Sequence, residues 1–203
     1  MGRGYALAYR LGLTPWERAA TEGAAQGAAL FDREEADRAQ PYGRALDLGC
    51  GTGRHTMDLA ARGWQATGVE LVPRALHQAQ QRAAAEGSAA TFVRGDVTAL
   101  DRTEIGSDYT FFFDLGCFHG LTDAQRAAMA AGVTAAAAPK ATMLLFAFQP
   151  GRRGPLPRGA SRTDIEQAFT GWTVIDEAHA DTSGMPGPLK KAAPLWYRLR
   201  RRS

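Results

Sequence analysis

The sequence predicts an α/β fold built on a mainly parallel sheet. Short apolar runs alternate with segments of helical periodicity along the chain, and this alternation is typical of strands joined by crossover helices. A glycine-rich turn, residues 49–53, directly follows the first apolar run, and the second run ends on Glu70. A strand, a glycine turn, a helix, a second strand and an acid, in this order, are typical of a nucleotide-type binding unit.

The expected elements follow from local signals. Strands are expected over residues 45–48, 66–69, 90–93, 109–113, 141–148, 172–179 and 194–199. Helices are expected over residues 14–32, 73–86, 122–138 and 161–169, with a shorter one directly after residue 53. The Thr-Pro-Trp-Glu sequence of residues 14–17 fits a capping box with proline at the first helical position. At 203 residues the chain is expected to form one domain.

The glycine turn has a spacing that favours one kind of ligand. A dinucleotide site requires a third glycine at position 54, which is Arg54 here. Asp47 precedes the turn, and a carboxylate there repels a pyrophosphate but attracts an ammonium group. Backbone amides at the start of the following helix can receive a carboxylate, while Glu70 lies where an acid binds ribose hydroxyls. The turn therefore suits a zwitterionic nucleoside, although a loop of another Rossmann-like protein is the alternative.

The segment from Leu46 to Gly53 resembles the first motif of class I S-adenosylmethionine-dependent methyltransferases. This resemblance implies a Rossmann-like three-layer sandwich, with a seven-stranded, mostly parallel sheet whose last strand is antiparallel, and S-adenosyl-L-methionine as cofactor. It also implies that Asp96 and the Val97 amide contact the adenine. The start of the predicted first helix, the compact core and the motif order resemble the small-molecule methyltransferases related to thiopurine and tellurite-resistance methyltransferases.

The resemblance gives a set of expected cofactor contacts: Asp47, Gly49, Cys50, Gly51, Gly53, Glu70, Leu71, Asp96, Val97, Asp114 and Trp16. It further implies that residues 1–40 form a helical segment over the cofactor and acceptor sites. Tyr5, Tyr9 and Trp16 are candidates for the acceptor pocket in that arrangement. An amphipathic helix that simply packs on the sheet explains the same residues.

Two residues after the fourth expected strand are candidates for catalysis. Asp114 lies at the carboxyl end of that strand, where ligands bind in parallel α/β sheets, and could hold the cofactor or orient the acceptor. His119 is a candidate general base because a neutral imidazole is available near pH 7. The alternatives are an acid that caps a turn and a structural histidine. Cys117 is a weaker candidate nucleophile.

The methyl acceptor is only loosely constrained by the sequence. Two loops rich in glycine and proline, residues 149–159 and 181–193, follow strands expected to run parallel to the first, so both should open on the cofactor side. Their basic residues favour an anionic acceptor, although a solvated basic loop explains the same residues and is the preferred interpretation. These residues are Arg152, Arg153, Arg158, Lys190 and Lys191. A thiol acceptor needs little base catalysis, whereas a hydroxyl acceptor gives His119 a purpose.

The composition of the chain limits which classes of binding partner are expected. The net charge is +3, and no aromatic-basic interleaving or appended RNA-binding module is visible, so nucleic acid is not the expected partner. Four isolated histidines and two cysteines lack metal-ligand spacing, so no metal is expected. No signal peptide or membrane span is evident, and a cytoplasmic location is expected. The open alternatives are a methyltransferase of nucleic acid or protein and a non-catalytic cofactor-binding protein.

Overall fold

A seven-stranded sheet forms the centre of the computed structural model, which describes residues 24–36, 38–151, 157–183, 185 and 187–203. The strand order is β3-β2-β1-β4-β5-β7-β6. Strands β1 to β5 pair in parallel, and β7 is antiparallel to both of its neighbours. These pairings confirm the predicted α/β class, including the antiparallel last strand.

The strands are β1 (Arg44–Leu48), β2 (Gln65–Glu70), β3 (Thr91–Arg94), β4 (Tyr109–Leu115), β5 (Ala137–Ala147), β6 (Trp172–His179) and β7 (Leu195–Arg201). The helices are α3 (Ala24–Glu35), α4 (Arg54–Ala61), α5 (Pro73–Glu86), α6 (Asp123–Ala136), α7 (Arg162–Ala168) and the short α8 (Gly187–Lys190). Two 3-10 turns, η1 (Leu100–Arg102) and η2 (Phe118–Gly120), precede and follow β4.

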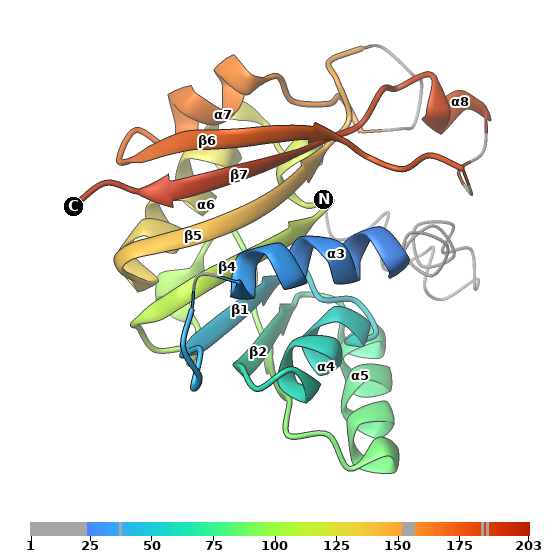
Figure 1. The fold of residues 1–203 in the computed structure, drawn as a ribbon, viewed down its shortest axis with the longest axis vertical. Helices are drawn as coiled ribbons and strands as arrows, with labels where there is room; N and C mark the ends of the chain where they lie inside the picture. The colour runs from blue at the N-terminus through green and yellow to red at the C-terminus, as the bar shows by residue number, and fades with distance from the viewer. Residues whose placement is uncertain (1–23, 37, 152–156, 184, 186) are drawn as a thin grey trace.

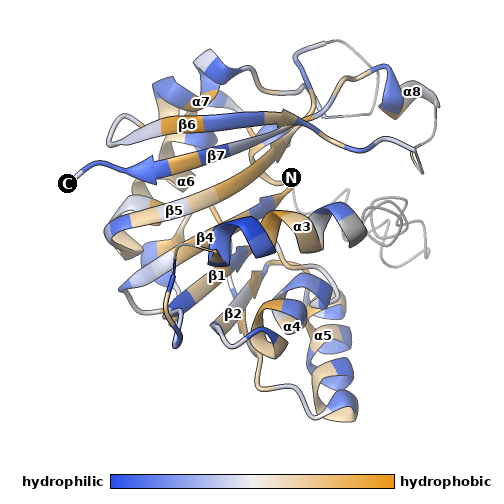
Figure 2. Cartoon of the chain, in the orientation of Figure 1, coloured by the Kyte–Doolittle hydropathy of each residue, from blue (hydrophilic) through white to orange (hydrophobic). Residues whose placement is uncertain are grey.

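The two faces of the sheet carry different helices, which gives the three layers of the sandwich. Figure 1 shows α3 and α4 in front of the strands and α6 behind them. Alternate residues of β4 supply the two cores, because Phe111 and Phe113 pack with α3 and α4, whereas Phe112 packs with α6 and α7. In Figure 2 the central strands are coloured as largely hydrophobic, while α5 carries an outward hydrophilic stripe.

Local capping signals placed the helix ends well. Thr122 and Ser161 each form a complete capping box, at the starts of α6 and α7. Pro73 begins α5, and Gly87 ends it in the left-handed conformation. The start of the first predicted helix at residue 14 lies outside the described residues, whereas its later part is present as α3 and extends to Glu35.

Two local predictions were wrong, whereas the connection from β3 to β4, for which no helix was expected, contains only the turn η1. Strand β5 begins at Ala137, directly after α6, because its first residues extend the pairing with Tyr109 of β4. The loop over residues 181–193 contains α8, whose four residues are too short for a periodic signal.

A buried ionic network fixes α3 on the sheet. Glu34 is 1% exposed, and its carboxylate accepts hydrogen bonds from Arg38 at 2.5 Å and from Arg198 of β7 at 2.8 Å. The hydroxyl of Thr142 in β5 donates to the same carboxylate. At the other end of α3, Gln26 bonds the backbone of Asp181 at 2.7 Å. The helix is therefore tied to strands and loops that lie more than a hundred residues away in sequence.

The described part of the chain contains no helix long and apolar enough to cross a membrane. Within that same part, no group of three or more histidine, cysteine or acidic side chains could hold a metal ion.

Candidate cofactor and acceptor site

The glycine turn, residues 49–53, joins β1 to α4 at the carboxyl edge of the sheet. Its glycines at 49, 51 and 53 have φ values of 70°, 55° and 82°, a conformation that costs other residues free energy. The amides of Gly49 and Cys50 both donate to the Val69 carbonyl, at 2.8 and 3.0 Å. A side chain at position 49 would place its Cβ 2.2 Å from the Cys117 sulfur. The turn is therefore packed tightly between β2 and the loop after β4.

Glu70 ends β2 and contacts the glycine turn directly. Its carboxylate accepts hydrogen bonds from the amides of Gly51, at 3.0 Å, and of Val72, at 2.7 Å. The acid is thus fixed at the mouth of the turn, the position that the ribose-binding prediction requires. That prediction is not tested by these contacts, since the same bonds also shape the turn.

Asp47 lies buried beneath the turn. Its carboxylate accepts a hydrogen bond from the Thr56 hydroxyl of α4 at 2.7 Å. Burial, together with the nearby carboxylates of Asp114 and Glu70, raises the pKa of Asp47 to about 7, against the lowering effect of the Thr56 hydrogen bond. A buried acid beside two other acids is stabilised by a cation, so the electrostatics suit the ammonium group of a zwitterionic ligand.

The remaining predicted cofactor residues lie around this edge. Asp96 follows β3, and its carboxylate accepts from the amide of Thr98 at 2.9 Å and from its hydroxyl at 2.7 Å. Val97 is half-buried beside it, and Leu71 is 38% exposed just after Glu70. Trp16 lies outside the described residues. The adenine-binding role of Asp96 and Val97 stays a prediction.

Asp114 is fully buried at the carboxyl end of β4. Its carboxylate accepts hydrogen bonds from the amides of Cys117, at 2.7 Å, and of Phe118, at 2.9 Å. Burial raises its pKa to about 6, against the lowering effect of these amides. These bonds are those of an acid that caps a turn, here η2, and a direct role in catalysis stays a prediction.

His119 is buried in η2 with its ring stacked on Phe148, the two centroids lying 4.8 Å apart. Its Nδ1 accepts a hydrogen bond of 3.4 Å from the Phe148 amide. In the neutral ring the proton is then on Nε2. The imidazole therefore fits hydrogen-bond donation better than proton abstraction, and its role as a base stays a prediction.

Cys50 lies within the turn and Cys117 lies beside it, both as protonated thiols. Cys117 donates to the Leu48 carbonyl, with 3.3 Å between sulfur and oxygen. Burial, with the neighbouring acids, raises the pKa of both Cys117 and Cys50 well above the usual range. Thiols of this kind are poor nucleophiles, so their observed contribution is packing.

The loop over residues 149–159 was predicted to bring basic residues to the acceptor, but Arg158 of this loop makes a structural contact instead. The Arg158 guanidinium pairs with Asp123 and donates to the Leu121 carbonyl at 2.8 Å. Lys190 and Lys191 are exposed around the end of α8, and Arg152 and Arg153 lie outside the described residues. Arg158 thus holds its loop to the start of α6 rather than presenting a free charge.

A cluster of buried aromatic rings, here called the aromatic wall, belongs to the core near the carboxyl ends of β4 and β5. It consists of Phe113 on β4, Phe146 and Phe148 at the end of β5, and Trp196 on β7. Neighbouring rings in this wall have centroids 5.2 to 5.7 Å apart. The partly buried side chains of Leu115, Met185 and Leu189 pack against it.

Sequence reasoning missed the wall because its members lie on three strands that only the sheet order brings together. It also missed His55 and Thr56. Their position in the first turn of the helix after the glycine turn could have marked both as neighbours of the predicted cofactor site.

Comparisons with known proteins agree with this geometry. Residues 45–140 match a family model described as a methyltransferase domain. A 23S rRNA (uracil(1939)-C(5))-methyltransferase of Shewanella sp. is 48% identical over 61 residues, which cover 30% of this chain and 14% of that protein. A 2-heptyl-1-hydroxyquinolin-4(1H)-one methyltransferase of Mycobacteroides abscessus is 26% identical over 70% of this chain and 63% of its own length. The chain therefore spans less than two thirds of either relative.

Solved structures extend the similarity to the fold. The magnesium protoporphyrin IX methyltransferase of Synechocystis, solved with bound S-adenosylhomocysteine, has a TM-score of 0.70 at 19% identity and covers 94% of both chains. The resemblance to class I methyltransferases is thereby confirmed, without a decision on the narrower group. The described chain has the Rossmann-like fold of S-adenosylmethionine-dependent methyltransferases, and residues 45–140 carry the sequence of a methyltransferase domain.

Proposed function

We propose that this chain binds S-adenosyl-L-methionine over the glycine turn and transfers its methyl group to a small molecule. The observation that carries the cofactor proposal is the buried Asp47 beneath a turn of three left-handed glycines, with Glu70 fixed at its mouth. When bound, the cofactor supplies an electrophilic methyl group on a sulfonium. In this proposal Asp47 attracts the ammonium group, the α4 amides receive the carboxylate and Glu70 binds the ribose.

The remaining predicted contacts complete the proposed site. Asp96, Val97 and Leu71 would surround the adenine. Asp114 would hold the loop after β4 in position through its bonds to the amides of Cys117 and Phe118. Because methyl transfer is a direct displacement, such positioning supplies much of the catalysis.

A small and largely apolar acceptor is supported by the aromatic wall. The wall lies at the carboxyl ends of β4 and β5, next to the turn where the cofactor is proposed to bind. Aromatic rings bind flat apolar molecules well. Two of the similar proteins are named for small aromatic or macrocyclic acceptors, a hydroxyquinolinone and magnesium protoporphyrin IX. An anionic acceptor has less support, since Arg158 is already paired.

Nucleic acid is the second candidate acceptor, and one observation favours it. The rRNA methyltransferase relative has the highest identity of the relatives described above, although the match covers only 14% of that protein. The narrower resemblance to thiopurine and tellurite-resistance methyltransferases also stays a prediction, as do a single domain over residues 1–203 and a cytoplasmic location.

Calorimetric titration with S-adenosylmethionine tests the cofactor site. We expect Asp47→Ala and Glu70→Ala each to weaken binding at least about tenfold, because each removes a charge or hydrogen-bonding partner of the ligand. Asp101→Ala and Glu86→Ala are the matched controls, since both acids are exposed and neither belongs to the predicted cofactor residues. Wild-type affinity in both site variants would contradict the proposed placement.

The acceptor class is tested with labelled cofactor and two extracts. We expect radioactive methyl groups to enter the small-molecule fraction of a cell extract and to be absent from purified RNA and protein. Label that enters RNA in a salt-sensitive way would instead support the nucleic-acid candidate.

A further inference from the structure

His55 is a buried imidazole at the start of α4, two residues after the last glycine of the turn. Its side chain is 13% exposed and lies between α4, α3 and β4. Its ring centroid is 5.1 Å from that of Phe113 on β4 and 6.3 Å from that of Phe31 on α3. A Cβ on Gly27 of α3 would lie 3.9 Å from its Cε1. Figure 1 shows α3 and α4 next to each other on this face of the sheet.

Neither ring nitrogen of His55 has a hydrogen-bond partner in the described structure, and both are closed from solvent. The nearest acid is Asp58, whose oxygen lies 3.8 Å from Nδ1 and is thus too far for a hydrogen bond. Burying a polar group without a partner costs about 1–3 kcal/mol, so such groups call for a ligand or another explanation.

The surroundings keep this imidazole uncharged. Burial, and to a lesser degree the charge of Arg54, lower the pKa of His55 to about 4. Of the elements packed against the ring, α4 supplies the charged Arg54 and Asp58, while the contacts from α3 and β4 are apolar. A neutral imidazole offers one hydrogen-bond acceptor and one donor, which suits a neutral protic group and not an anion.

The position of His55 places it between the two parts of the proposed site. On one side is the glycine turn from which α4 begins. On the other is Phe113, which immediately precedes Asp114 and belongs to the aromatic wall. His119, in contrast, lies at the far end of the wall and already uses Nδ1 to accept from Phe148.

We infer that His55 binds the reacting group of the acceptor, and that this group is a hydroxyl on an aromatic or N-hydroxy compound. This inference rests on the proposed methyl transfer. The hydroxyl donates a hydrogen bond to the acceptor nitrogen of His55 while its oxygen forms a bond to the methyl carbon. The carbon–sulfur bond breaks, and its electron pair stays on sulfur. The oxygen then loses its proton to water, which carries away the positive charge of the sulfonium, so charge and atoms balance.

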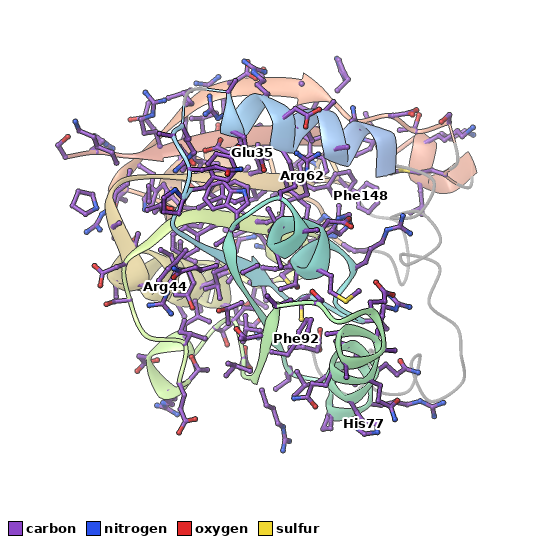
Figure 3. All side chains as sticks on the ribbon, turned by 60° about the horizontal axis from the view of Figure 1, so that its bottom comes forward. Glu35, Arg44, Arg62, His77, Phe92 and Phe148 are labelled. Carbon is purple, nitrogen blue, oxygen red and sulfur yellow. The ribbon has the colours of Figure 1, made fainter. Side chains whose placement is uncertain are left out.

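Two variants and three matched acceptors test this inference. His55→Phe removes both nitrogens but keeps an aromatic ring, and His55→Gln keeps a group that can accept a hydrogen bond. His77→Phe is the control, since His77 is exposed on α5 and lies at the outer edge of the molecule in Figure 3. The probes are 4-hydroxyquinoline, 4-aminoquinoline and quinoline-4-thiol, each assayed with labelled S-adenosylmethionine and by titration of histidine imidazole resonances in the presence of S-adenosylhomocysteine.

We expect the hydroxyl compound to be methylated and to shift the His55 resonances. In His55→Phe its kcat/KM should fall about tenfold, because one hydrogen bond to the acceptor is lost, and His55→Gln should keep more of the activity than His55→Phe. Cofactor affinity should stay within about twofold, and the stability of His55→Phe should not fall, because an unsatisfied polar ring is replaced by an apolar one.

Several outcomes would overturn the inference. Full activity of His55→Phe on the hydroxyl compound would do so, as would preferred methylation of the thiol or amine. The inference is equally rejected if no member of the panel is methylated or shifts the His55 resonances. Failure of the proposed function is a separate result, because the wild-type protein would then not bind S-adenosylmethionine in the calorimetric titration.

Discussion

Two regions of the molecule differ in how far apart in the sequence their hydrogen-bonded side chains lie. We name the two regions after the proposed sites. In the cofactor half, which comprises β1 to β3, the glycine turn, α4 and α5, the polar contacts are short in sequence: Asp47 to Thr56 spans nine residues and Glu70 to Gly51 spans 19. In the acceptor half, which comprises β4 to β7, their loops and α3, Phe148 to His119 spans 29 residues and Arg198 to Glu34 spans 164. Local motifs therefore specify the first half, and tertiary packing specifies the second.

The arginines show the same difference. In the acceptor half they tie distant segments together: Arg158 fixes a loop to α6, and Arg38 and Arg198 meet at Glu34. A further tie between the halves joins Glu35 of α3 to Arg62, which directly follows α4 (Figure 3). The Arg62 Nη1 donates to the Glu35 Oε2 at 2.7 Å. Thus basic residues that the sequence suggested for ligand binding can be structural ties instead.

Substitution of Gly49 by alanine should have the largest effect and would break the contact between the two halves. The added Cβ would lie 2.2 Å from the Cys117 sulfur, at a φ of 70°. We expect a loss of about 4–5 kcal/mol in the free energy of unfolding, measured with urea, together with loss of cofactor binding.

Two variants separate the clash from the backbone strain. Gly87→Ala has a similar φ of 63° but open space around the Cβ, so it should cost only about 1 kcal/mol. Adding Cys117→Ala to Gly49→Ala should recover part of the lost stability, because it removes the clashing sulfur. Equal costs for the two glycine substitutions would mean that the contact with the loop after β4 is unimportant.

Substitution of Glu34 by alanine tests the long-range ties of the acceptor half. It leaves the guanidinium groups of Arg38 and Arg198 without their carboxylate partner in a buried place. We expect a loss of about 3–4 kcal/mol in the free energy of unfolding. Asp32→Ala on the same helix is the control and should cost less than about 1 kcal/mol, because Asp32 is 69% exposed. A Glu34 variant as stable as the control would show that α3 is held by apolar packing alone.

The smallest expected effect concerns Asp47 in the cofactor half, and it appears in how the free energy of unfolding depends on pH. Since the pKa of Asp47 is raised from 3.8 to about 7, the folded protein binds more protons than the unfolded chain between these values. Its contribution to stability is therefore lost as pH rises from about 4 to about 7. Asp47→Asn mimics the protonated acid, so it should be about 2–3 kcal/mol more stable than wild type at pH 8 and similar near pH 4.

The difference in stability between the wild type and Asp47→Asn isolates the effect of Asp47, because the other groups with shifted pKa values are present in both. Asp114 has a raised pKa of about 6 and acts in the same direction, whereas His55, lowered to about 4, favours the folded state as pH rises towards 6.5. Urea titrations at pH 4, 6 and 8 give the difference. A constant difference across this range would indicate that Asp47 is ionised throughout.

The sequence by itself determined the fold class, the order of the elements and the cofactor half. Alternating apolar runs, capping boxes at Thr122 and Ser161 and the spacing of the glycine turn all act over a few residues, so they can be identified without tertiary information. The placement of Asp47 and Glu70 at one edge follows from the same rule, because parallel strands end on the same side of a sheet. The predicted cofactor residues and their chemistry come from this local level.

Only the tertiary structure decided the acceptor half. The aromatic wall depends on β7 lying between β5 and β6, which no local pattern specifies. The engagement of Arg158 with Asp123, and of His119 with Phe148, depends on loops meeting across the sheet edge. The isolation of His55 likewise requires α3 to cover α4. Burial, and with it the charge state and hydrogen bonding of these side chains, is a property of the packed molecule and not of the segments that compose it.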